Sequence, residues 1–203
     1  MRVPKLIFGL VAVALLSGCI AQTPGTLAKP PESSSSPSAS AASTAPISWL
    51  IDFNAVGPFT IRGSFSAEAG KVAPYSRESP TTCPSSVASA FSHDGSPSVL
   101  VRVAGTGSDV ISNIFVSRDA AVPEGSGILV ATARGIGISS SESNVIAAYP
   151  DAIKSAQPGF NAYWLGNGEA RHLVFRVRGG IVDGISLQAD QQYYWDYCGT
   201  SNG

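Results

Sequence analysis

The strongest restriction on the fold of this chain is a weak internal repeat between residues 55 and 188. Phe59 and Ile61 match Ile136 and Ile138 at one constant spacing along the chain. Three more apolar positions match at a slightly shorter spacing: Ile111, Ile114 and Val116 correspond to Val182, Ile185 and Leu187. The shorter spacing is expected if the second copy has shorter loops. Two repeats are too few for a solenoid, so a first half, about 47–121, and a second half, about 127–203, are expected to pack into one globular domain. The alternative is a chance similarity between two regions that both form hairpins.

Strand-forming segments dominate both halves. Residues that are aromatic or branched at Cβ favour strands, and they gather in "SWLIDF", "SVLVRV", "VISNIFVS", "GILVATA", "YWL", "RHLVFRVRG" and "IVDGISL". Alternation in "RHLVFRV" places Leu173, Phe175 and Val177 on one face, with His172, Val174 and Arg176 on the other. Gly179-Gly180 predicts a tight hairpin. Further hairpins are expected at Gly166-Asn167-Gly168 and near Asp94-Gly95.

Helical signals are fewer and shorter. In "GIGISSSESNVIAAYP", Ser139 and Glu142 have the spacing of a capping box. Val145, Ile146 and Tyr149 would give that helix an apolar side before Pro150 helps to end it. A phosphate-binding loop is the alternative, but both the dinucleotide and the Walker patterns are incomplete. We therefore predict an α+β domain, in which short helices cover one face of an antiparallel sheet.

The N-terminus has the pattern of an export signal. Arg2 and Lys5 precede "LIFGLVAVALL", an apolar run shorter than the roughly 20 residues of a membrane-spanning helix. The run ends in Leu16-Ser17-Gly18-Cys19, which resembles the lipobox of bacterial lipoproteins. This resemblance implies cleavage of residues 1–18 and acyl chains such as palmitate on Cys19, which anchor the protein on the extracytoplasmic side of the cell membrane. The alternative is an ordinary signal peptide cut after Ala21, which would leave a freely secreted protein.

A stalk follows the anchor. Residues 19–46 are rich in Ser, Ala and Pro and almost lack large apolar side chains, so they cannot form a core. A flexible chain of this length spans roughly 30 Å. Removal of residues 1–18 leaves a small negative net charge, which argues against a nucleic-acid partner.

One segment carries a family resemblance. The stretch "GIGISSSESNVIAAYP", followed by "LVFRVRGGIVDGISL", resembles the module found in β-lactamase inhibitor proteins and in small lipoproteins of envelope assembly. The likeness covers most of residues 55–188 and implies tandem copies that form a helix-clad antiparallel sheet. Those inhibitors also resemble one another through a disulfide within each repeat, whereas each half here holds one cysteine. No inhibitory residues are therefore assigned.

The two remaining cysteines are expected to pair. Export brings Cys83 and Cys198 to an oxidising compartment, where a disulfide between them is the simplest outcome. Such a bridge would join the C-terminal segment to the first half, with a stabilisation of at most roughly 4–5 kcal/mol. The alternative is two separate thiols.

No catalytic residue, metal site or cofactor is assigned. The two histidines, His93 and His172, are far apart in sequence and belong to no zinc-binding motif. The chain has no Gly-x-Ser-x-Gly nucleophile motif. A triad assembled from distant residues is an alternative that the sequence leaves open.

Two surface features are candidates for binding. His172, Arg176 and Arg178 would form an anion-attracting stripe, unless they are merely the solvated side of a half-buried strand. Tyr193, Trp195 and Tyr197 share one face of the aromatic tail "QQYYWDYC". That face is either core packing, the interpretation we favour, or a platform for a protein or glycan. The expected function is a membrane-anchored, non-catalytic binding module with a protein partner in the envelope. The alternative is an envelope hydrolase or a domain that senses a small ligand or glycan.

Overall fold

The computed structural model describes residues 48–79, 85–118, 127–167 and 171–189, which all belong to the compact unit Ser43–Gly203. These residues form twelve strands and two helices: β1 (Ser48–Ile51), β2 (Ala55–Val56), β3 (Phe59–Thr60), α1 (Phe65–Ala69), β4 (Ser76–Arg77), β5 (Ala88–Ser92), β6 (Ser98–Val103), β7 (Ile111–Ser117), β8 (Leu129–Thr132), α2 (Glu142–Ala148), β9 (Ile153–Gln157), β10 (Phe160–Gly166), β11 (His172–Arg178) and β12 (Ile181–Gln188). In this part of the chain, neither helix has the length and apolar content that crossing a bilayer requires.

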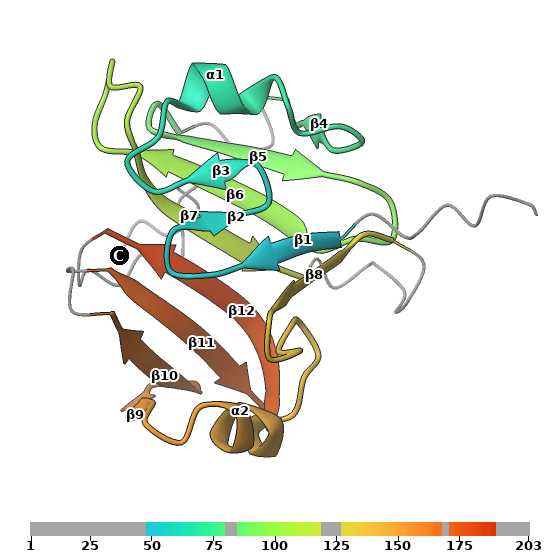
Figure 1. The fold of residues 1–203 in the computed structure, drawn as a ribbon, viewed down its shortest axis with the longest axis vertical. Helices are drawn as coiled ribbons and strands as arrows, with labels where there is room; N and C mark the ends of the chain where they lie inside the picture. Colours follow the sequence, from blue (N-terminus) through green and yellow to red (C-terminus); the bar gives the residue numbers. More distant parts are fainter. Residues whose placement is uncertain (1–47, 80–84, 119–126, 168–170, 190–203) are drawn as a thin grey trace, which may run out of the picture. The chain divides into compact units, whose positions relative to one another are not determined.

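The fold is mostly β, so the prediction of an α+β domain with short helices on one face of a sheet is wrong. The helices span five and seven residues, whereas the strands form a four-stranded and an eight-stranded sheet. The error has a physical cause in "SWLIDF" and "GILVATA". These segments form β1 and β8 of a second, small sheet, β3-β2-β1-β8 (Figure 1). Its side chains Ile51 and Val130 belong to the buried core, so a sheet contributes where only helices were expected.

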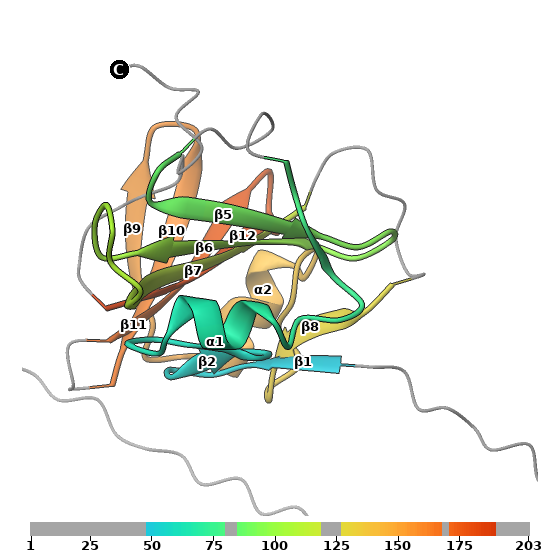
Figure 2. The ribbon, with the colours of Figure 1, turned by 90° about the horizontal axis from the view of Figure 1, so that it is seen from above.

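One core joins the two sheets. Val99, Val116, Ile185 and Phe175 lie side by side across β6, β7, β12 and β11, and none is more than 1% exposed. Ile51, Val56 and Phe59 of the small sheet belong to the same buried cluster. Burial of this continuous apolar surface is the main stabilising contribution to such a domain. The two halves therefore share a single core, and Figure 2 shows the small sheet and α1 on the same side of the strands β5, β6 and β7.

Aromatic side chains fix β1 within this core. Trp49 stacks on Tyr75, with 4.4 Å between ring centroids, and meets Phe59 edge-on at 6.3 Å. The Tyr75 hydroxyl donates a hydrogen bond of 2.8 Å to the Pro97 carbonyl, which satisfies its polar end. Burial raises the pKa of Tyr75 to about 12. Tyr75 therefore remains a neutral part of the core at physiological pH.

The eight-stranded sheet has an internal two-fold pattern. Its order, β4-β5-β6-β7-β12-β11-β10-β9, places four strands of the first half beside four of the second, with the antiparallel pair β7–β12 at the centre (Figure 1). The register of this pair follows the sequence repeat. Ile114 lies opposite Leu187, and their counterparts Ile185 and Val116 also lie opposite each other. A pseudo-two-fold axis therefore passes between Phe115 and Ser186, which are each other's counterparts.

The correspondence extends beyond the central strands. Ser64 and Ser141, which have the same spacing as Phe59 and Ile136, are the N-caps of α1 and α2. Arg62 and Ser139, which correspond in the same way, are the two described non-glycine residues with positive φ, at 68° and 71°. Register shifts interrupt β6 at Arg102/Val103 and β11 at Arg176/Val177, one in each half. At these positions the two halves thus share backbone conformation as well as apolar pattern.

The hairpins follow the glycine signals. β11 and β12 pair antiparallel on either side of Gly179 and Gly180, whose φ values are 60° and 81°. Two successive residues with positive φ form the turn that suits a two-residue hairpin loop. β5 and β6 pair across a connection in which Gly95 has a φ of 73°. Both predicted hairpins are confirmed, and β10 pairs with β11 as expected.

Candidate binding pocket

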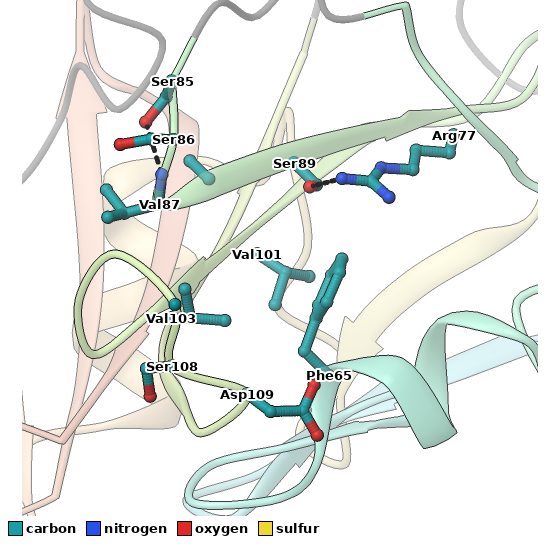
Figure 3. Close-up of a pocket in the computed structure, with 12 residues that line it drawn as sticks. Phe65, Arg77, Ser85, Ser86, Val87, Ser89, Val101, Val103, Ser108 and Asp109 are labelled. Carbon is teal, nitrogen blue, oxygen red and sulfur yellow. Dashed lines mark hydrogen bonds between the residues drawn. The ribbon is translucent and has the colours of Figure 1, made fainter.

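A cavity of about 350 Å³ opens in the first half, between α1, the edge of the eight-stranded sheet and the loop before β7 (Figure 3). This volume is at the lower end of the range for small-ligand sites. The side chains that decide its chemistry are Phe65, Arg77, Ser89, Val101, Val103 and Asp109. The cavity therefore combines apolar side chains with serine hydroxyls, one cationic group and one anionic group.

Asp109 joins the helical wall of the cavity to the loop before β7. Ser64 caps α1 by accepting a hydrogen bond of 3.2 Å from the Ala67 amide. The Asp109 carboxylate accepts hydrogen bonds from the Ser64 hydroxyl at 2.5 Å and from the Ser66 amide at 2.8 Å. These bonds, that from the Ser64 hydroxyl first, lower the pKa of Asp109. An ionised carboxylate with a lowered pKa is a poor general base near neutral pH.

Arg77 reaches the cavity from the edge strand β4. Its Nη2 donates a hydrogen bond of 2.7 Å to the Ser89 hydroxyl, which lies on the neighbouring strand β5. Its guanidinium carbon is 5.3 Å from the centroid of the Phe65 ring, within the distance of a cation–π contact. Figure 3 shows the Phe65 ring standing between Arg77 and Asp109. The two opposite charges are therefore separated by an apolar surface.

The second half holds a polar cluster instead. Glu142, the first residue of α2, accepts hydrogen bonds from Lys154 Nζ at 3.0 Å, from Asn161 Nδ2 at 3.1 Å and from the Tyr163 hydroxyl. The Tyr163 bond is the main reason why the pKa of Glu142 is lowered, followed by that from Lys154. Burial, with the bond to Glu142, raises the pKa of Tyr163. The cluster is a structural network around an ionised carboxylate.

These bonds correct the predicted capping box. The N-cap of α2 is Ser141, which accepts from the Asn144 amide at 3.2 Å, rather than Ser139. Ser139 has a φ of 71° and instead accepts a hydrogen bond of 2.9 Å from Arg118. The Glu142 carboxylate bonds to the β9 and β10 side chains. Val145 is buried as expected, but Ile146 is 50% exposed, so it adds nothing to the apolar side of the helix.

The expected anion stripe has an acidic residue beside it. Asp183 on β12 accepts from Arg176 Nε at 2.7 Å and lies 3.6 Å from Arg178 Nε. The Arg176 guanidinium also lies over the Phe115 ring, at 5.3 Å. His172 makes an edge contact with Trp164, with 5.9 Å between ring centroids. The carboxylate between the two arginines reduces the positive charge that this strand can offer an anion.

The other candidate residues lie outside the described part of the chain. They are the lipidation site Cys19, the expected disulfide partners Cys83 and Cys198, and the aromatic face Tyr193, Trp195 and Tyr197. The stalk and the export signal also lie outside it.

Sequence reasoning missed the residues that form the cavity. The signal was present in the repeat, because "ASAF" at Ala88–Phe91 aligns with "AYWL" at 162–165. Ser89 then stands where the second half has Tyr163. The site is marked by a small residue, Ser89, at a position that an aromatic ring fills in the other half.

Within residues 48–79, 85–118, 127–167 and 171–189, no three His, Cys, Asp or Glu side chains gather closely enough to hold a metal ion. Comparisons of the chain with protein-family models, with curated proteins and with solved structures find no match.

Proposed function

We propose that this chain is an exported protein, anchored to the extracytoplasmic side of the membrane through Cys19, that works as a non-catalytic binding module for a protein partner. The export signal and the lipobox-like sequence support the location. The observation that carries the binding role is the cavity beside Phe65 and Arg77. The cavity mixes apolar side chains with serine hydroxyls and two charged groups. At a protein interface, pockets of this kind receive single anchoring side chains of the partner.

The chemistry of the cavity favours binding over catalysis. Its carboxylate, Asp109, already accepts hydrogen bonds from Ser64 and Ser66. Its cation, Arg77, is bonded to Ser89 and lies over Phe65. Groups held in this way can orient a ligand, but they supply no poised base for proton transfer.

Photo-crosslinking in intact cells tests the proposal. A photoreactive amino acid replaces Ser86, an exposed residue on the lining of the cavity, in the full-length chain. The full-length protein should crosslink to a protein identified by mass spectrometry. Ser89→Tyr should abolish this crosslink by filling the cavity. Ala156→Tyr adds the same side chain to an exposed position on β9 and should leave the crosslink unchanged.

Other results would contradict the proposal. An identical set of crosslinked proteins in the Ser89→Tyr variant would show that the cavity is not the partner site. Crosslinks to envelope glycan instead of protein would support the alternative of a glycan-sensing domain. The Cys19→Ala variant should lose lipid labelling and either leave the membrane fraction or keep its uncleaved signal. Unchanged labelling would refute the lipid anchor.

A further inference from the structure

The two halves have different side chains at one equivalent packing position. Ser89 on β5 lies opposite Val101 on β6, as Tyr163 on β10 lies opposite Phe175 on β11. The pairs are equivalent, because the spacing from Ser89 to Tyr163 equals that from Val101 to Phe175. Tyr163 and Phe175 are 3% and 0% exposed. Two rings thus occupy the second half at the position where the first half has a hydroxymethyl group, an isopropyl group and the cavity.

The surroundings of this position are partly preserved. In the second half, Lys154 from the edge strand β9 lies 5.5 Å from the centroid of the Tyr163 ring, and Glu142 accepts from its hydroxyl. In the first half, Arg77 from the edge strand β4 bonds directly to Ser89. Phe65 stands in the place of Glu142, since each directly follows the N-cap serine of its helix. The cavity therefore keeps a cation and lacks the ring. Phe65 replaces the helix carboxylate, and the carboxylate on its lining, Asp109, comes from the loop before β7 and is bonded to Ser64 and Ser66.

We propose that the cavity binds an aromatic side chain of the partner, placed where Tyr163 lies in the second half. Arg77 would face this ring, because a guanidinium group favours the face of an aromatic ring. Phe65, Val101 and Val103 would surround it with apolar contacts. With Phe65 in the place of Glu142, a phenylalanine ring fits this environment as well as a tyrosine ring. The inference rests on the proposed function, since it names the group through which the partner is held.

A matched pair of small probes tests the inference on the purified domain with its stalk. Benzyl alcohol carries the aromatic ring, and cyclohexylmethanol carries a saturated ring of similar size. Benzyl alcohol should shift the methyl NMR signals of Val101 and Val103 saturably, at least several-fold more tightly than cyclohexylmethanol does. Ser89→Tyr should abolish these shifts and raise the Tm, whereas Ala156→Tyr should change neither.

The Arg77→Leu variant distinguishes the contribution of the cation to probe binding from the contribution of apolar burial. Loss of the cation should weaken benzyl alcohol binding about two- to five-fold and leave cyclohexylmethanol unchanged. If Ser89→Tyr does not fold, Val101→Phe fills the same cavity from the opposite strand, with the residue that the second half uses. Equal affinity for both probes, or shifts confined to other methyl groups, would overturn the inference.

The inference and the proposed function can fail separately. A partner crosslink that depends on Ser89, without preferential binding of benzyl alcohol, would refute the aromatic ligand and keep the binding module. Selective binding of benzyl alcohol without any Ser89-dependent crosslink would refute the protein partner instead.

Discussion

At the scale of single residues, Glu142 shows how position decides the role of a side chain. The carboxylate is 26% exposed, yet three side chains from β9 and β10 donate hydrogen bonds to it. A hydrogen bond to a charged group stabilises more than one between neutral groups. Glu142 therefore joins the start of α2 to the edge of the large sheet.

This network predicts an acid dependence of stability. The pKa of Glu142 is lower in the folded state than its usual value of 4.5, so its stabilisation is present above that value and is lost as the pH falls through the lower, folded-state pKa. Glu142→Gln should cost roughly 1.5–3 kcal/mol at pH 7. Thermal melts of the two proteins should converge as the pH is lowered below 4.5.

A control distinguishes this network from the general effect of acid. Glu78→Gln removes a carboxylate next to β4, at the opposite edge of the sheet. It should leave the pH profile of the Tm close to that of the unsubstituted protein. If the Tm of Glu142→Gln differed from that of the unsubstituted protein by the same amount from pH 7 to pH 3, this would contradict a lowered pKa of Glu142.

At the scale of elements, the sequence identified the last hairpin well and the helix start poorly. Gly179 and Gly180 interrupt an alternating pattern, and glycine is the residue that two positive φ values require, so this turn had one interpretation. The N-cap of α2 was harder to predict, because three consecutive serines could form it: Ser139, Ser140 and Ser141. Comparison with the first half resolves them, because "RGS" at 62–64 contains a single serine and places the cap at Ser64.

The two caps make the same bond to their helices, but Ser64 also donates to a carboxylate, Asp109. Ser64 and Ser141 each accept a hydrogen bond of 3.2 Å from the amide three residues later. Replacement of an N-cap serine by alanine typically costs about 1 kcal/mol. Urea denaturation should show a loss of that size for Ser141→Ala and a larger loss for Ser64→Ala, which also removes the bond to Asp109.

Ser139→Ala is the matched control for the caps. A capping box at Ser139 would predict a loss for Ser139→Ala comparable to that of Ser141→Ala. The structure predicts a smaller loss, since Ser139 contributes one hydrogen bond with Arg118 and caps no helix. Equal losses for the two serines would contradict the assigned cap.

At the scale of the molecule, the pair β7–β12 makes the two halves depend on each other. Ile114 and Ile185 occupy equivalent positions beside the pseudo-two-fold axis and are 0% and 1% exposed. Each contacts a core to which both sheets contribute. Apolar side chains of the two halves therefore bury one another in this core.

This arrangement predicts one cooperative unfolding transition. Ile114→Ala and Ile185→Ala should each cost about 2–5 kcal/mol, because both leave a cavity in the shared core. Circular dichroism and tryptophan fluorescence should give the same urea midpoint for each variant. Two separated transitions, with one substitution affecting each, would show instead that the halves unfold independently.

The overall architecture was harder to predict than its parts. Leu173, Phe175 and Val177 face the core as their alternation predicts, but Val174 on the other face is also fully buried. Alternation within one strand shows which side chains share a face. It does not show which other elements cover each face. The small sheet was missed for a related reason: its strands β2 and β3 have two residues each, which is too short for a periodic signal.

The unequal pair Ser89 and Tyr163 has a consequence for how substitutions accumulate in this molecule. Substitution of Tyr163 should impair folding, because loss of its ring would remove both packing and the hydroxyl that bonds to Glu142. Ser89 escapes that requirement, since larger side chains have room beside it. Many replacements there should yield well-folded proteins that no longer bind the proposed aromatic group. Mutational tolerance measured by protein abundance and by ligand binding should therefore diverge at position 89 and coincide at position 163.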